Sequence, residues 1–190
     1  MSFRNEEKLH LSNSKLFLFK DYLYKKNVKK IFDKRKINSI YFDNKNFDMY
    51  THSIEGLVPR KKIRLRYYNK DINELLFETK ISSAEGRYKI SKKLINNNFL
   101  KGIIDFDYGM IYPVTIVTYN RSYYSLNKIR ITIDENITYQ KYKNQRIYRD
   151  DNIVAEIKSS FEYPKDIIEE FFPFTRIRFS KYCNSIEKCF

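Results

Sequence analysis

The sequence has little of the material from which several common kinds of site are built. Its 190 residues include two cysteines, two histidines, four glycines and no tryptophan. These counts exclude a zinc site of ordinary spacing, a Cys/His nucleophile pair and a glycine-rich phosphate loop. Any metal ion must therefore be held by carboxylates, which favours magnesium or manganese.

Long apolar runs are also missing. No segment approaches the roughly 18 to 20 apolar residues needed to cross a bilayer, and the opening MSFRNEEKLHL lacks the apolar core of a signal peptide. We therefore expect a cytoplasmic chain. Cys183 and Cys189 lie six residues apart in a predicted helix and point to different faces, so we expect both to be free thiols.

What the sequence has in excess is positive charge. Lysine and arginine number 37 against 23 acidic residues, which gives a net charge of +14, and 42% of the residues are hydrophobic. This hydrophobic content excludes a disordered basic tail, and the length suits a single domain over residues 1–190. Because biased base composition also enriches lysine together with Asn, Ile, Tyr and Phe, the placement of the arginines carries more weight than the lysine count.

Alternation of apolar and polar side chains predicts a mainly antiparallel sheet. The expected strands are residues 3–11, 37–43, 60–68, 74–81, 86–93, 114–124, 127–134 and 153–160. Capping and periodicity predict helices after residues 12–14, within 43–55, between Pro164 and Pro173, and after Ser180, with a connector at 96–102. The predicted fold class is α+β.

Several of the expected strands carry cations on one face and apolar side chains on the other. The division is clearest in residues 60–68, and it recurs wherever a charged residue alternates with aliphatic ones: Lys62, Arg64, Arg66, Glu78, Lys80, Arg121, Arg130, Asp134, Glu156 and Lys158. A solvated face would explain any one strand. The repetition favours a closed or nearly closed barrel whose cationic wall lacks counter-ions and so demands a polyanion.

The residues on these strands resemble a known family. Ser39-Ile40-Tyr41-Phe42-Asp43-Asn44 and Arg60-Lys61-Lys62-Ile63-Arg64-Leu65-Arg66-Tyr67 resemble the VTC domain of polyphosphate polymerases. The resemblance continues in order through Glu78-Thr79-Lys80, Tyr119-Asn120-Arg121, residues 129–134, Ala155-Glu156-Ile157-Lys158 and Arg178-Phe179-Ser180-Lys181-Tyr182. It implies the triphosphate tunnel fold, an antiparallel β-barrel with flanking helices, and transfer of the ATP γ-phosphate to a growing polyphosphate chain.

The resemblance also implies a set of site residues. The residues expected to act on the transferred phosphoryl group are Arg64, Arg66, Arg121 and Arg130. The residues expected to bind substrate are Lys8, Lys62, Lys80, Lys89, Tyr119, Lys158, Arg178, Ser180 and Lys181, of which Lys62 and Lys158 are added because they share the cationic faces. Glu156 is the expected ligand of Mn²⁺ or Mg²⁺. ATP and polyphosphate are the expected partners, and a membrane protein is a candidate one.

Two alternatives stay open. A triphosphate or polyphosphate hydrolase would need a positioned water and a base, for which Glu6 and Glu78 are candidates, although pairing with neighbouring cations is the simpler role for both. The first strand reads Arg4-x-Glu6-x-Lys8, not the Glu-x-Glu-x-Lys of hydrolytic tunnel enzymes, which favours the VTC branch. The other alternative is a non-catalytic polyanion binder. Nucleic acid is disfavoured because the arginines alternate with aliphatic residues within strands.

Overall fold

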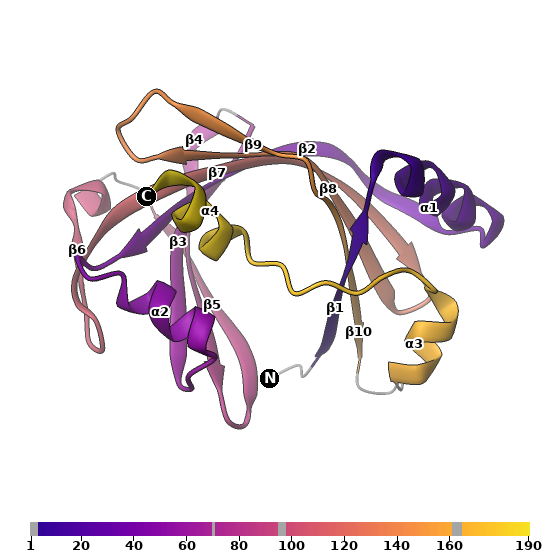
Figure 1. Cartoon of the computed structure of the whole chain (residues 1–190), viewed down its shortest axis with the longest axis horizontal. Coiled ribbons are helices and arrows are strands. Elements are labelled where there is room, and N and C mark those ends of the chain that lie inside the picture. Colours follow the sequence, from indigo (N-terminus) through magenta and orange to yellow (C-terminus); the bar gives the residue numbers. More distant parts are fainter. Residues whose placement is uncertain (1–3, 70, 95–97, 161–164) are drawn as a thin grey trace. The chain divides into compact units, whose positions relative to one another are not determined.

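The computed structural model describes residues 4–69, 71–94, 98–160 and 165–190. The chain forms two compact units, whose helices and strands are labelled in Figure 1. Unit 1 comprises Met1–Lys36, Tyr119–Ile137 and Asp150–Phe179, and unit 2 comprises Ile37–Thr118, Thr138–Arg149 and Ser180–Phe190. Three long strands, β2, β7 and β8, contribute residues to both units: Lys29–Asp43, Gly109–Leu126 and Ile129–Lys141.

Unit 1 is an antiparallel sheet with helices on its apolar face. Its other elements are β1 (Arg4–Leu11), α1 (Asn13–Lys25), β10 (Ile153–Ser160) and α3 (Lys165–Phe171). The strands follow the order β1-β10-β8-β7. Alternate residues of β1, β8 and β10 pack with α1 and the α3 region in one buried core, whose members are Leu9, Leu11, Phe19, Leu23, Ile129, Ile131, Ile133, Ile153, Ala155, Ile157, Ile168 and Phe172.

Unit 2 contains the second half of the strand order, β7-β2-β3-β4-β5. Its own elements are α2 (Asp48–Glu55), β3 (Arg60–Tyr68), β4 (Asp71–Ser83), β5 (Gly86–Leu94), a 3₁₀ turn (Asn98–Lys101), β6 (Ile103–Asp105) and α4 (Lys181–Cys189), while β9 (Ile147–Asp150) pairs with β8. Fully buried Ile63 and Leu65 on β3 alternate with charged residues, as the sequence pattern predicted.

The buried carboxylate of Asp43 organises the end of β2. It accepts hydrogen bonds from the backbone N–H groups of Asn44 (2.8 Å), Met49 (3.1 Å) and Tyr50 (3.1 Å), and from the hydroxyl of Tyr182. Burial raises the pKa of Asp43, and these four donors act in the opposite direction. Burial, reinforced by Asp43, also raises the pKa of Tyr182. One side chain thus joins β2, the start of α2 and α4.

The predicted class, an antiparallel sheet with flanking helices, is confirmed, and the differences lie in strand bounds: β7 begins before residue 114, and β8 continues past residue 134 through buried Ile137 and Tyr139. Strands β3 and β10 have the predicted bounds, and Ser180 caps α4 by accepting from the backbone N–H of Cys183 at 3.2 Å. The first eight residues of β2 were not predicted because all of them are exposed and show no apolar alternation. Short strands β6 and β9 were missed too. Phe3, Asn96 and Pro164, which bounded expected elements, lie outside the described residues.

Two further expectations concern cysteines and membranes. Cys183 and Cys189 are both free, as predicted. Among the described helices, none is long and apolar enough to span a bilayer.

Replacing Asp43 with alanine is expected to lower the free energy of unfolding by about 2 to 4 kcal/mol. The replacement leaves buried hydrogen-bond donors without the charged acceptor that they have in the wild-type protein. Urea unfolding measures the loss. Asp151→Ala, at an exposed aspartate, is the matched control and should change stability by less than about 0.5 kcal/mol. An equally small loss for Asp43→Ala would show that Asp43 does not organise this corner of unit 2.

Candidate functional site

Positive charges form a row across three strands of unit 2. Lys62 on β3 lies directly opposite Lys80 on β4, which lies opposite Lys89 on β5. In the adjacent row, Arg64 lies opposite Glu78. Like charges placed directly opposite one another are unfavourable in a sheet. The lysine row therefore favours any anion that can lie across it.

Glu78 holds the cations next to this row. It is 2% exposed, and its Oε2 lies 2.7 Å from Arg64 Nε and 3.5 Å from Arg66 Nε, while Oε1 accepts from Lys89 Nζ at 2.7 Å. Burial alone would raise the pKa of Glu78, but the charges of Arg64, Arg66 and Lys89 lower it to about 2. The carboxylate is therefore ionised at neutral pH. Arg64 also donates to the hydroxyl of Tyr41 at 3.0 Å.

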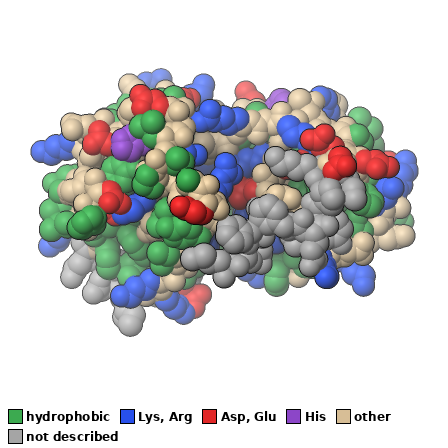
Figure 2. Space-filling view, turned by 90° about the horizontal axis from the view of Figure 1, so that it is seen from below, with side chains coloured by type: hydrophobic (Ala, Val, Ile, Leu, Met, Phe, Trp, Pro, Cys, Tyr) green, Lys and Arg blue, Asp and Glu red, His purple; other side chains and the backbone are tan. Residues whose placement is uncertain are grey.

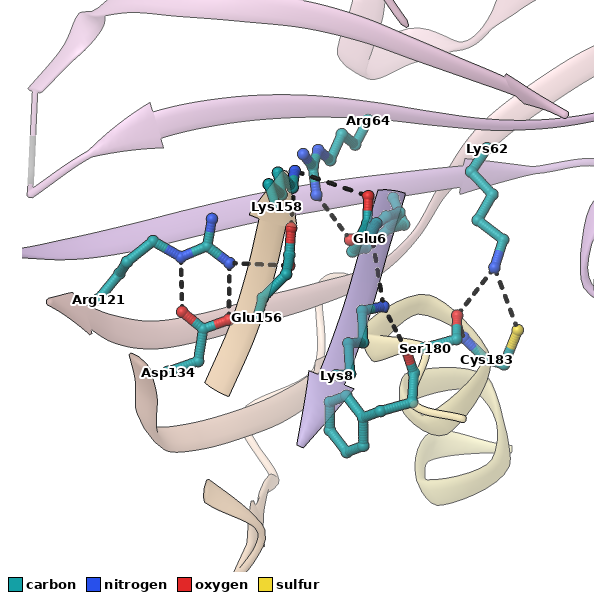
Figure 3. Close-up of polar contacts among 12 residues, drawn as sticks. Glu6, Lys8, Lys62, Arg64, Arg121, Asp134, Glu156, Lys158, Ser180 and Cys183 are labelled. Carbon is teal, nitrogen blue, oxygen red and sulfur yellow. Dashed lines mark hydrogen bonds and ion pairs between the residues drawn. The ribbon is translucent and has the colours of Figure 1, made fainter. Parts of the chain in front are cut away.

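Lys62 points at the start of α4. Its Nζ donates to Ser180 Oγ at 2.9 Å and lies 3.7 Å from Cys183 Sγ, as Figure 3 shows, and it sits over the ring of Tyr182. Burial, with help from the nearby charge of Lys80, lowers the pKa of Lys62. Strand β3 and the first turn of α4 thus bring together two residues that are far apart in the sequence, Lys62 and Ser180.

A forked ion pair lies at the centre of the polar face of unit 1. Arg121 on β7 donates from Nε and Nη2 to the two oxygens of Asp134 on β8, at 2.5 and 2.7 Å (Figure 3). Asp134 is fully buried. The same guanidinium lies 3.7 Å from Glu156 Oε2 and over the ring of Tyr119, 5.3 Å from its centroid. This geometry fixes the orientation of Arg121 in the absence of substrate.

Charges of opposite sign alternate between β1 and β10. Lys8 lies opposite Glu156, and Glu6 lies opposite Lys158. Lys158 Nζ is 2.6 Å from Glu156 Oε1 and 3.6 Å from Glu6 Oε2, while Lys8 Nζ is 3.8 Å from Glu6 Oε1 and donates to the carbonyl of Phe179 at 2.6 Å. Burial by itself would raise the pKa of Glu156, but Arg121, Lys158 and Lys8 lower it well below its usual range. Glu156 is ionised.

Some buried polar atoms beside these charges have no hydrogen-bond partner within the described chain. They include Ser39 Oγ and Arg66 Nε in unit 2 and Thr132 Oγ1 in unit 1. Ser39 lies opposite Arg66 in the sheet, and Thr132 lies opposite Glu156. Native proteins leave few such groups unmatched. Both polar faces therefore keep unused hydrogen-bonding capacity next to the predicted site residues.

The structure divides the predicted site residues between the units. Unit 1 contains Lys8, Tyr119, Arg121, Arg130, Glu156, Lys158 and Arg178, and unit 2 contains Lys62, Arg64, Arg66, Lys80, Lys89, Ser180 and Lys181. Arg130 and Arg178 are exposed, and Lys181 begins α4. Arg64, Arg66 and Lys89 share the carboxylate of Glu78, Lys62 contacts Ser180, and Lys80 lies between Lys62 and Lys89 in the sheet register.

The expectation of a cationic wall without counter-ions is wrong. Arg64, Lys89, Arg121 and Lys158 each lie within 4 Å of a carboxylate. Figure 2 likewise shows Lys and Arg side chains interspersed with Asp and Glu on the face in view. The simpler role proposed for Glu6 and Glu78, pairing with neighbouring cations, is confirmed. Asp134 received no role from the sequence, because the cross-strand contact that makes it the partner of Arg121 depends on register.

Glu156 is the predicted ligand of a divalent metal ion, and its surroundings show whether it could bind one. It is ionised, but each of its oxygens faces a cation, Lys158 or Arg121. Within the described residues, no group of three His, Cys, Asp or Glu side chains could hold an ion. A hard cation at Glu156 would have one protein carboxylate and would need its remaining ligands from phosphate and water, as Mg²⁺ commonly does.

In unit 1 the antiparallel sheet has helices against its apolar face and interleaved Arg, Lys and carboxylates on the other. The chain belongs to the VTC domain family, whose model matches residues 3–190. None of the curated proteins compared with the chain matches it in sequence.

Solved structures share the fold at low sequence identity. A candidate adenylyl cyclase from Hippeastrum, described as having a dominant triphosphatase activity, is 14% identical with a TM-score of 0.62, over 97% of this chain and 96% of that one. A candidate adenylate cyclase from Vibrio parahaemolyticus is 13% identical with a TM-score of 0.60, over 98% of each chain. A Pyrococcus horikoshii protein is 16% identical with a TM-score of 0.58, over 98% and 99%. These similarities establish the fold alone.

The low pKa of Glu78 predicts a specific acid sensitivity. The folded-state pKa is about 2 against an ordinary value of 4.5, so the ionised carboxylate stabilises the fold above about pH 4.5 and loses that effect as the pH falls toward 2. The shift corresponds to roughly 3 kcal/mol at neutral pH. Glu78→Gln should therefore lose stability at pH 6 to 7, and its difference from wild type should shrink as the pH approaches 2.

Urea unfolding at a series of pH values measures this difference. Glu55→Gln, at an exposed glutamate, is the control and should follow the wild-type curve. A difference between Glu78→Gln and wild type that stays constant with pH would show that the ion pairs of Glu78 do not stabilise the fold.

Proposed function

We propose that this chain is an enzyme that transfers the γ-phosphate of ATP to the end of a growing polyphosphate chain. The observation that carries the proposal is the register of Lys62, Lys80 and Lys89 beside Arg64 and Arg66, which presents a row of cations to an extended anion. Membership of the VTC domain family supports it, because the sequence resembles the VTC domain of polyphosphate polymerases at these residues.

Phosphoryl transfer suits a site made of cations on rigid strands. The protein's main task in this reaction is to hold the donor and acceptor in line and to stabilise charge on the phosphoryl oxygens. Arg64, Arg66, Arg121 and Arg130 offer planar forks of N–H donors, and the lysines offer single charges. A terminal oxygen of the acceptor chain attacks the γ-phosphorus of ATP, the bond to the β-phosphate oxygen breaks, and ADP leaves.

The buried carboxylates prepare these donors for substrate. Glu78 fixes Arg64 and Lys89, and Asp134 fixes Arg121, so the cations are already ordered when the phosphates arrive. Less conformational freedom is then lost on binding. Glu78 is nearly fully buried and contacts three cations with a single negative charge, so positive charge on those cations remains available to a ligand.

Glu156 would hold Mg²⁺ or Mn²⁺ together with phosphate oxygens, and the bound ion would neutralise charge on neighbouring phosphates. Lys158, which contacts Glu156 here, would then be free to turn toward the same phosphates, while Arg121 stays paired with Asp134.

Hydrolysis of triphosphate is the second candidate function. The dominant triphosphatase activity described for the Hippeastrum protein, which shares the fold, favours it. Glu6 is the candidate base of such a reaction in this chain. Its carboxylate lies between Lys8 and Lys158, and this pairing lowers its suitability as a proton acceptor.

Products distinguish the two reactions. Incubation of the protein with ATP and Mn²⁺ or Mg²⁺ should yield ADP together with polyphosphate that lengthens with time, resolved by gel electrophoresis. Free phosphate without chain growth would replace the polymerase proposal with the hydrolase. Absence of both products with either metal would contradict enzymatic function and leave polyanion binding.

Two substitutions test the assigned roles. Glu156→Gln should abolish the metal-dependent reaction, while Glu169→Gln, at an exposed glutamate of unit 1, should retain it. Arg64→Ala should slow the reaction about ten- to hundredfold, because it removes a charge-assisted contact to phosphate in the transition state. Urea unfolding must show that each variant is folded. Full activity in folded Glu156→Gln would remove this residue from the metal site.

A further inference from the structure

Two arginines of unit 1 stack on a single tyrosine ring. The guanidinium carbon of Arg130, on β8, lies 5.7 Å from the ring centroid of Tyr123, on β7, and that of Arg35, on β2, lies 5.8 Å from it. Phe32 packs edge-on against Tyr123 with centroids 5.7 Å apart, and Arg35 lies 5.0 Å from the Phe32 centroid. We call Phe32, Arg35, Tyr123 and Arg130 the arginine–tyrosine cluster.

The cluster differs from the rest of the polar faces in having no counter-ion. Within the described residues, no carboxylate lies within 4 Å of Arg35 or Arg130, whereas Arg64 and Arg121 each form a close ion pair. Asp33, two residues before Arg35, pairs with Lys30 at 2.8 Å. The aromatic rings hold the two guanidiniums near one another by cation–π contacts, without a direct ion pair to a described carboxylate.

Charged side chains on neighbouring strands connect the arginine–tyrosine cluster with Glu156. Lys158, which contacts Glu156, lies directly opposite Arg130 in the β10–β8 pair. Strands β10, β8, β7 and β2 are consecutive neighbours in the sheet. With about 4.8 Å between neighbouring strands, the backbones of the strands that carry Lys158 and Arg35 are roughly 14 Å apart across the sheet. An anion that touches both side chains must cross the two strands between them.

The exposed guanidiniums of the cluster suit a phosphate ligand. Tyr123 is 5% exposed and offers little ring surface to a ligand, whereas Phe32 is 48% exposed, with Arg35 and Tyr123 against part of its ring. Both arginines are exposed, and a guanidinium held beside a ring by a cation–π contact keeps N–H groups for an acceptor. Phosphate oxygens match this fork.

We propose that Arg35 and Arg130, supported by Tyr123 and Phe32, form a subsite for phosphate groups of a long polyphosphate chain. The inference rests on the proposed function and adds chain-length selectivity to it. A chain that reaches from Lys158 to Arg35 gains the contacts of both guanidiniums. Tripolyphosphate is too short to span the strands between Lys158 and Arg35. The protein should therefore bind long chains more tightly than tripolyphosphate, because of these added contacts and not only because long chains carry more charge.

The experiment compares two ligands on three proteins. Dissociation constants for tripolyphosphate and for a long-chain polyphosphate of defined length are measured by calorimetry at fixed ionic strength, without metal or ATP. The proteins are wild type, Arg35→Gln and the control Arg149→Gln, which removes the same charge from an exposed position in unit 2. Arg35 is exposed, so its replacement should leave the fold intact, and circular dichroism verifies this.

We expect Arg35→Gln to weaken long-chain binding about tenfold, the loss of one charge-assisted phosphate contact, and to change tripolyphosphate binding less than roughly twofold. Arg149→Gln should change neither value beyond roughly twofold. Arg35→Lys, which keeps the charge but loses the fork, should recover only part of the affinity.

Two results would overturn the subsite. Equal weakening of both ligands by Arg35→Gln would assign Arg35 to general electrostatic attraction, and unchanged binding of both would leave it without a role. Failure of the wild-type protein to bind either ligand is a different result, since it contradicts the proposed function itself. Tight wild-type binding with no chain-length dependence contradicts the subsite alone.

Discussion

The structure depends on buried carboxylates that each hold several cations on the polar faces of the sheet. Glu78 contacts Arg64, Arg66 and Lys89, and it is kept ionised by them although it is almost inaccessible to solvent. A buried charge is tolerated only when paired, so each carboxylate and its cations must be retained together. This mutual dependence allows a strand with three cations in alternate positions to fold without a bound anion.

The same pairing defines what a ligand has to do. Glu78 orders three cations with a single negative charge, and the chain as a whole carries a net charge of +14. Phosphate oxygens can take up the remaining N–H donors without displacing the carboxylate. The arginine–tyrosine cluster achieves order in a second way, since aromatic rings replace the carboxylate and leave the whole charge for a ligand. The two arrangements suit a polyanion whose charges repeat at short intervals.

The sequence predicted the alternating strands well and their partners poorly. Bounds of β3 and β10 followed from period-two alternation, because burial of one face dictates it. The first half of β2 carries no such signal, and Arg35 within it therefore escaped notice. Cation positions were readable residue by residue, but the ion pairs of Arg121 with Asp134 and of Glu78 with Lys89 depend on register between strands. Local patterns do not encode register, so the expected absence of counter-ions was wrong.

The central claim is that the polar faces are built for phosphate chains and not for anions in general. Thermal unfolding of the wild-type protein in tripolyphosphate, compared with sodium chloride at matched ionic strength, tests it most directly. Specific binding to the folded state predicts that the midpoint temperature rises steadily with tripolyphosphate concentration, by mass action, well beyond the rise in chloride. Equal shifts in the two salts would mean that both only screen the repulsion between cations, and would contradict the account.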